Sequence, residues 1–128
     1  MADKIANKLS DNVYLARSGI FGGAAEAYNL IKVPKNAFIM NVWLEIITTH
    51  AGNTCTVGFA GNATTADADG FIDATLGITT TAGFIRAIDD AQPGSKAKWF
   101  SAGGGMITAT PSATTSRQRL FVEYAIIS

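Results

Sequence analysis

The chain has 128 residues, no formal net charge and 16% charged residues, against about 25% in ordinary globular domains. A single domain of this length buries a core without staples, and one cysteine excludes an intramolecular disulfide framework. The balanced charge argues against a nucleic acid partner, which requires a basic patch, and no apolar run approaches the ~18 residues of a membrane span.

Residues 1–10 are polar apart from the isolated Ile5 and Leu9. They lack the apolar stretch of a signal peptide, so we expect a protein made in a reducing cytosol. The pattern predicts an N-terminal arm, followed by a single β-sandwich domain over residues 11–128. Ile5 and Leu9 are candidate partner contacts on this arm.

A glycine-rich stretch, 19–27, follows the first predicted strand, 12–17. It contains three glycines and places Ile20 and Phe21 where little sheet is expected. Segments of this kind are often ordered only by a partner, so Ile20 and Phe21 are predicted to contact one.

The hydrophobic period of the chain that follows is mostly two, which is typical of strands with one face in a core. The clearest run is 38–48, where the even positions form an unbroken apolar face. Its odd positions, which include Ile39, Trp43 and Ile47, are predicted to face outward.

The C-terminal run 120–127 repeats this alternation and places Phe121 on its outer face. Glycine, proline, asparagine and aspartate fill the intervals between runs, as turns require. About eight to nine short strands without a convincing amphipathic helix predict an all-β fold, either a β-sandwich or a barrel. The remaining strands are predicted at 28–33, 54–59, 70–75, 84–88, 98–101 and 106–110.

The single histidine and the single cysteine, His50 and Cys55, lie on either side of a predicted turn. Cys55 alternates with Val57 and Phe59, so it is predicted to point into the core as a small apolar residue. We therefore expect a buried thiol and a turn histidine rather than a catalytic dyad.

Asp67 and Asp69 precede Gly70 in a pattern that superficially resembles a calcium loop. The glutamate that an EF-hand requires at its twelfth position is missing, which excludes that class. The two aspartates are predicted to be solvated turn residues, with a weak irregular cation site as the alternative, and no cofactor is expected. The glycines at 103–105 lack the ending of a phosphate-binding loop and predict a turn.

Two rival functions start from the outer faces of the strongest strands. Glu45 and Glu123 would suit a glycosidase if they were paired, but solvated or salt-bridged glutamates are favoured, so no enzyme is expected. A carbohydrate-binding or host-attachment module would use Trp43, Trp99 and Tyr14 as stacking platforms.

Apolar residues on these outer faces are the remaining feature. Ile39, Trp43 and Ile47 share a predicted outer face with Glu45, and Phe121 occupies the equivalent face of the last strand. Contiguous exposed apolar patches mark interaction sites, so these residues are predicted to contact a subunit or a partner.

A resemblance to a known family rests on four segments of the chain: VPKNAFIMNVW (33–43), CTVGFAGN (55–62), DADGFI (67–72) and LFVEYAI (120–126). In these segments, and over roughly residues 30–127, the chain resembles the small β-sandwich structural proteins of tailed bacteriophages, of the capsid decoration or cement type. The resemblance implies a jelly-roll-like sandwich without enzymatic activity that assembles as a homo-oligomer, commonly a trimer, on the major capsid protein. It also implies production in the host cytoplasm and a final location at the capsid surface of the virion.

Overall fold

The computed structural model describes residues 13–50, 52–61, 67–72, 74, 77–79, 81–87, 99–101, 103–112 and 116–127. The predicted N-terminal arm, with Ile5 and Leu9, lies outside these residues. Throughout the described part of the chain the regular structure is β-strand, as the period-two pattern predicts. No described helix is long and apolar enough to cross a membrane.

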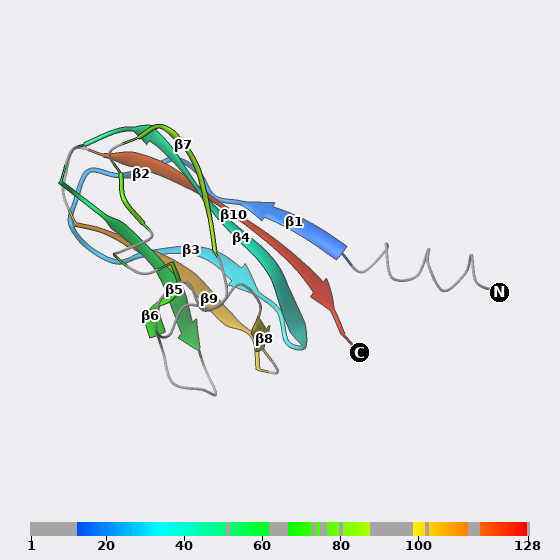
Figure 1. The fold of residues 1–128 in the computed structure, drawn as a ribbon. Coiled ribbons are helices and arrows are strands. Elements are labelled where there is room, and N and C mark those ends of the chain that lie inside the picture. The colour runs from blue at the N-terminus through cyan, green and yellow to red at the C-terminus, as the bar shows by residue number, and fades with distance from the viewer. Residues whose placement is uncertain are drawn as a thin grey trace.

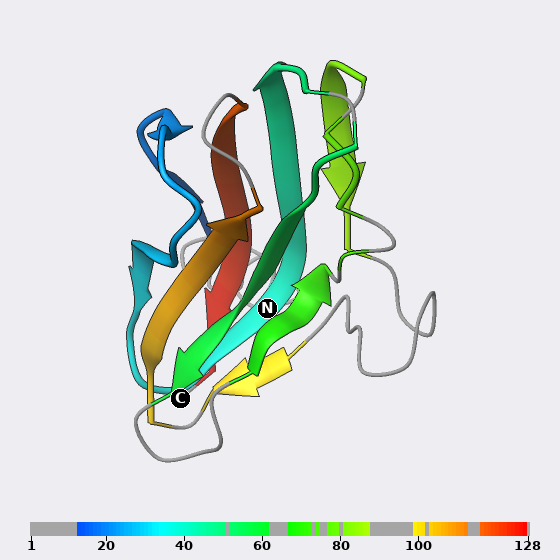
Figure 2. The ribbon, with the colours of Figure 1, turned by 90° about the vertical axis from the view of Figure 1, so that its left-hand side faces the viewer.

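The strands form two antiparallel sheets that pack face to face (Figure 1, Figure 2). The first sheet has six strands in the order β1-β10-β4-β7, with β2 paired to β10 and β8 paired to β4. The second has four strands in the order β3-β9-β5-β6. The bounds are β1 (Val13–Arg17), β2 (Phe21–Gly22), β3 (Tyr28–Val33), β4 (Ala37–Thr48), β5 (Cys55–Gly61), β6 (Asp67–Ile72), β7 (Gly83–Arg86), β8 (Trp99–Ser101), β9 (Gly105–Pro111) and β10 (Arg117–Ile126).

The pairing of the strands is nested along the chain. The outermost strands pair as β1 with β10, the next as β3 with β9, then β4 with β7, and the innermost as β5 with β6. A ribbon of antiparallel pairs that is rolled up in this way, with successive pairs falling in alternate sheets, is a jelly roll. The predicted all-β, jelly-roll-like sandwich is confirmed, with the short β2 added to the predicted strands.

The core lies between the two sheets and follows the alternation of their strands. From β4 it receives Val42, Leu44 and Ile46, and from β10 it receives Leu120 and Val122, all of them at most 2% exposed. Burying one such side chain contributes about 1.5–3 kcal/mol, so the interdigitated inner faces are the main source of stability. The four-stranded sheet supplies the facing residues Val57, Phe59, Phe71, Ile72, Ile107 and Ala109.

A bulge in β4 corrects the predicted facing of its first half. Glu123 pairs with Asn41 and Tyr124 with Ile39, which leaves Met40 as an extra residue in β4. An extra residue shifts the alternation by one, so Ile39 points into the core at 0% exposure and Met40 is half-buried. The outward facing predicted for Ile39 is therefore wrong, because a prediction from strict alternation does not allow for the extra residue.

The segment after β1 is also more ordered than predicted. Phe21 and Gly22 form β2, which pairs with the start of β10, and Phe21 is only 6% exposed. Its ring lies 5.5 Å from that of Tyr28. Gly22 has φ +133°, and a Cβ at this position would collide with the carbonyl oxygen of Ser116, so glycine is required there.

Candidate functional site

The outer face of the six-stranded sheet carries a row of two aromatic residues with an arginine at each end. The pairing register places Arg17 of β1, Phe121 of β10, Trp43 of β4 and Arg86 of β7 side by side. Phe121 and Trp43 are half-buried, and both arginines are exposed. Because neighbouring strands are ~4.8 Å apart, the backbones of the two arginines are separated by about 14 Å.

A hollow of about 310 Å³ lies beside this row, lined by Leu15, Trp43, Phe84, Phe121 and Glu123. Phe84 extends from β7 across β4, and its ring lies 5.8 Å from that of Phe121 at an interplanar angle of 52°. Leu15 is 67% exposed and Phe84 is 63% exposed. Exposed large apolar residues around a hollow, together with arginine, have the composition of a contact surface. We call the following set the aromatic face: Leu15, Arg17, Trp43, Phe84, Arg86 and Phe121.

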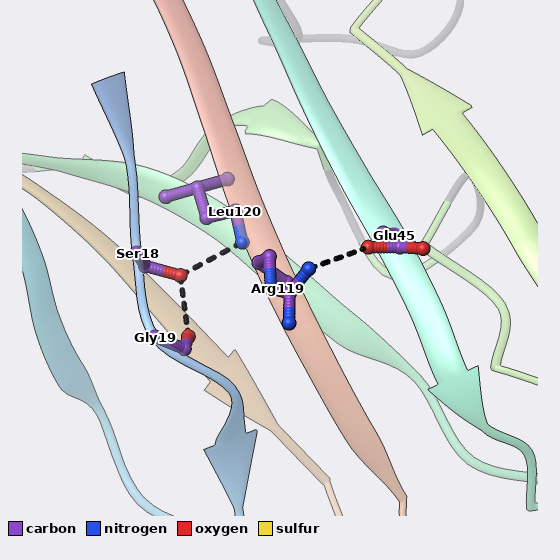
Figure 3. A network of polar contacts seen from close by, with 5 residues as sticks. All are labelled: Ser18, Gly19, Glu45, Arg119 and Leu120. Carbon is purple, nitrogen blue, oxygen red and sulfur yellow. Dashed lines mark hydrogen bonds and ion pairs between the residues drawn. The ribbon is translucent and has the colours of Figure 1, made fainter.

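The two glutamates beside the aromatic face are already engaged. An oxygen of Glu45 lies 3.8 Å from Nη1 of Arg119 (Figure 3). Oε1 of Glu123 accepts a hydrogen bond of 2.7 Å from Nδ2 of Asn41. Among the described residues, Arg17 and Arg86 form no ion pair, so the aromatic face presents two positive charges without a carboxylate partner.

Ser18, the residue that follows β1, holds the chain next to β10 through hydrogen bonds. Oγ of Ser18 accepts a hydrogen bond of 2.9 Å from the backbone N–H of Leu120 and donates one of 2.7 Å to the carbonyl of Gly19 (Figure 3). The backbone N–H of Ser18 donates in turn to the carbonyl of Leu120 at 2.9 Å. These bonds hold the end of β1, and with it Arg17, beside β10.

The predicted contact residues divide into accessible and buried ones. Trp43 and Phe121 lie together on the outer face, and Ile47 is 38% exposed at the far end of β4. Ile20 is 55% exposed between β1 and β2. The remaining predictions have other outcomes: Ile39 and Phe21 belong to the core, and Ile5 and Leu9 lie outside the described residues.

Sequence reasoning missed four of the six residues of the aromatic face, namely Leu15, Phe84 and the two arginines. These residues sit on the short strands β1 and β7, and nothing in the sequence says that both strands border the same aromatic pair. A local pattern does mark them, because Leu15 and Phe84 each stand two residues before an arginine of the same strand. Two residues is the repeat of one strand face, so each pair points to the same side.

The histidine and the cysteine do not form a reactive pair. Cys55 is completely buried, and this burial raises the pKa of its thiol to about 12. His50 is exposed, and its Nδ1 forms a hydrogen bond with Nδ2 of Asn53. The backbone N–H of His50 donates to the carbonyl of Thr79 at 2.9 Å. The predicted buried thiol and turn histidine are confirmed.

The acidic and glycine-rich motifs have different outcomes. Asp67 and Asp69 belong to β6, which begins three residues earlier than the predicted strand, so they are not turn residues before it. No described group of three or more His, Cys, Asp or Glu residues could hold a metal ion. Gly104 and Gly105 have φ of +76° and +153°, as the predicted turn before β9 requires.

Glu45 and Glu123 are too far apart to act as the paired carboxylates of a glycosidase. Glu45 pairs in register with Arg119, and Glu123 pairs with Asn41, four residues away along β4. Four residues of strand span about 13 Å, whereas paired glycosidase carboxylates lie ~5–9.5 Å apart. Each glutamate has its own partner, so the predicted structural role is favoured.

A common stacking platform of Tyr14 and Trp43 is also absent. Leu15 and Arg17 share the outer side of the sheet with Trp43, so Tyr14 points to the opposite side of β1. The ring of Tyr14 instead stacks on that of Tyr124, with centroids 5.4 Å apart. The side chain of Trp99, the third predicted platform, lies outside the described part of the structure.

Comparison with known proteins gives structural similarity only. No family model matches the chain, and no curated protein sequence matches it. A chain from the acidic stable capsid of Helicobacter pylori bacteriophage KHP30 matches with TM-score 0.65 and 19% identity, over 91% of this chain and 89% of that one. A chain of the cyanophage Pam1 capsid matches with TM-score 0.64 and 21% identity, over 91% and 86%. A chain of the Ralstonia phage GP4 capsid matches with TM-score 0.63 and 17% identity, over 91% and 85%.

These three matches cover nearly the whole length of both partners in each comparison. The chain therefore has the same fold as chains found in three bacteriophage capsids. At identities of 17–21% the similarity establishes the fold and leaves the function to be argued from the surface.

Proposed function

We propose that this chain is a non-enzymatic structural protein of a bacteriophage virion and, within that class, a decoration or cement protein at the capsid surface. The observation that carries the proposal is the fold shared with chains of three phage capsids over 91% of this chain. The resemblance of the segments at 33–43 and 120–126 to decoration proteins supports the finer assignment.

The exposed apolar side chains of the six-stranded sheet support assembly with other molecules rather than a monomer in solution. Leu15 and Phe84 keep most of their apolar surface in water, which a monomer gains nothing from. In a symmetric shell each such contact is repeated many times, so a modest contact per copy becomes a stable attachment.

The proposal names two partners, further copies of this chain in a homo-oligomer, commonly a trimer, and the major capsid protein. The protein would be produced in the host cytoplasm and incorporated into the virion. The proposed contacts are the predicted residues that remain accessible, together with those of the N-terminal arm: Ile20, Trp43, Ile47, Phe121, Ile5 and Leu9.

The test is the composition of virions of the phage that encodes the chain. Heads and tails are separated, and quantitative mass spectrometry gives the copies of this chain per copy of the major capsid protein. We expect a fixed ratio in heads and loss of head stability when the gene is deleted, with recovery on adding back the purified protein. Presence in tails alone would favour the host-attachment alternative, and absence from both would overturn the proposal.

The oligomeric state is tested separately with the purified protein. Light scattering at micromolar concentration is expected to give a trimer. A stable monomer that also fails to bind heads lacking the protein would contradict both the oligomer and the decoration role.

A further inference from the structure

The aromatic face combines a positive charge at each end with an apolar centre. All four arginines of the chain lie on strands of the six-stranded sheet, and Arg17 and Arg86 bracket the Phe121–Trp43 pair. The two glutamates next to this row are held by Arg119 and Asn41. Among the described residues neither Arg17 nor Arg86 has a carboxylate partner, so a partner that carries carboxylates would complement these two charges.

The spacing of the arginines restricts the shape of that partner. Their backbones lie about 14 Å apart, and an extended chain covers about 13 Å between residues i and i+4. Residue i+2 of the same chain points to the same side, midway between the two carboxylates. It would lie over Phe121 and Trp43, beside the hollow of about 310 Å³. A helix brings i and i+4 within ~6 Å of each other, too short for this span.

We propose that the aromatic face binds an extended segment of another protein with the pattern acidic-x-apolar-x-acidic. The two carboxylates pair with Arg17 and Arg86, and the central apolar side chain packs on Trp43, Phe121 and Phe84. The proposal rests on the proposed function only for placing this partner in a virion, because the binding chemistry follows from the face alone.

A second copy of this chain is a poor occupant. Of its ten acidic residues, only Asp69 and Asp73 are four positions apart. The residue between them, Phe71, is 0% exposed in the core, so the segment cannot be offered to another copy without unfolding the sheet. The occupant is therefore a different polypeptide.

The test uses two synthetic peptides of identical composition with the purified full-length protein. Gly-Ser-Glu-Thr-Leu-Thr-Glu-Ser-Gly carries the pattern, and Gly-Ser-Thr-Glu-Leu-Glu-Thr-Ser-Gly turns both glutamates away from the leucine side. Binding is followed by ¹H–¹⁵N correlation spectra through the indole N–H of Trp43, which is assigned with Trp43→Phe. We expect the first peptide to bind about tenfold to twenty-fivefold more tightly, because it forms two exposed ion pairs that each contribute up to ~1 kcal/mol.

Variants then locate the peptide on the protein. Arg17→Gln and Arg86→Gln are each expected to weaken the first peptide about threefold to fivefold and to leave the second peptide unchanged. Phe84→Ser, at a side chain that is 63% exposed, is expected to weaken both. Lys32→Gln on the four-stranded sheet is the matched control and is expected to change neither.

Three outcomes would overturn the proposal. They are equal binding of the two peptides, binding that survives the double change Arg17→Gln and Arg86→Gln, and dissociation of the protein's own oligomer by Phe84→Ser. The last result would make the aromatic face a contact between copies. Each of them leaves the head-binding measurement unaffected, so the failure of this inference is distinguishable from failure of the proposed function.

Discussion

The outer faces of the two sheets differ sharply, although the same alternation produces both. The six-stranded sheet turns aromatic, leucine and arginine side chains outward. The four-stranded sheet turns out small or hydroxyl residues and one methionine from β5 and β9. Lys32 is the charged residue among the described side chains of its strands. By alternation, the positions of β5 and β9 that face away from the core are Thr56, Gly58, Ala60, Met106, Thr108 and Thr110, of which Gly58 and Thr108 are buried.

The difference between the two outer faces shows which features of the sheets the fold requires. Both sheets contribute fully buried inner faces to one core, so alternation alone satisfies folding. A sheet with small, neutral outward residues folds as well as one with aromatic and arginine residues. Folding therefore does not require the aromatic face, which supports our proposal that it contacts another polypeptide.

The comparison of the two outer faces depends first on which residues of β4 point outward. The substitution Ile39→Asp is the strongest test of this assignment. Ile39 is 0% exposed, and an unpaired buried carboxylate costs several kcal/mol, a large part of the stability of a small domain. We expect loss of cooperative folding by circular dichroism, as for Val42→Asp.

Ile47→Asp is the matched control, because it places the same change on the same strand at a side chain that is 38% exposed. It is expected to cost less than about 1 kcal/mol. If Ile39→Asp melted like the original protein, β4 would lack its bulge and the first half of its outer face would be assigned to the wrong residues.

The facing of β5 is tested through the pKa of Cys55. Burial raises the pKa of this thiol from 9.0 to about 12, so the folded protein keeps it neutral where the unfolded chain ionises. The stability gained is complete below pH 9 and is lost as the pH rises from 9 to 12, by about 1.4 kcal/mol per pH unit.

The measurement is the free energy of unfolding in urea between pH 8 and pH 11, compared with Cys55→Ala. The difference between the two proteins removes the contributions of all the ionisable groups that they share. Parallel pH profiles would show that Cys55 is accessible and that Thr56 and Gly58 face inward.

The inner face of β10 contains one polar exception, Gln118. It is 0% exposed, and neither Oε1 nor Nε2 has a hydrogen-bond partner among the described residues. An unpaired buried polar group costs ~1–3 kcal/mol, so Gln118→Met, which keeps the volume, is expected to raise the free energy of unfolding by about 1–2 kcal/mol.

Urea unfolding measures this change, and Gln118→Glu serves as the opposing variant that should destabilise strongly. A loss of stability in Gln118→Met would mean that the amide has partners. The inner face of β10 would then be less purely apolar than that of β4.

Much of this arrangement could be predicted from alternation, and the failures have physical causes. The core facing of Val42, Leu44, Leu120 and Val122 follows from a period of two, which is local. The bulge that buries Ile39 depends on how β4 pairs with β10. The paired residues Asn41 and Glu123 are 82 positions apart in the chain, so a local hydrophobic pattern cannot predict the bulge.

The aromatic face was predictable only in part for the same reason. Trp43 and Phe121 lie on long strands with clear alternation, which predicts that both face outward. Leu15 and Phe84 lie on β1 and β7, which join the same sheet only through the nested pairing of the jelly roll. A surface assembled from four strands needs the strand order, which composition and period do not supply.

The smallest expected effect concerns the ion pair beside the aromatic face. Glu45 and Arg119 are 27% and 28% exposed at 3.8 Å, so Glu45→Gln is expected to lower the free energy of unfolding by about 0.5 kcal/mol. The loss should vanish in 1 M salt, where exposed charges are screened within ~3 Å. Lys32→Gln on the opposite sheet should cost nothing measurable in either condition.

The effect of Glu45→Gln tests whether the charged residues on the six-stranded sheet contribute to folding. If Glu45→Gln cost more than about 2 kcal/mol, the charged residues of the six-stranded sheet would be part of the folding energy, and the contrast between the sheets would need no partner to explain it. A near-neutral result leaves Arg17 and Arg86 without a structural reason for being on this face. Among the described residues they have no carboxylate partner, which is why we propose that they attract a carboxylate of another polypeptide.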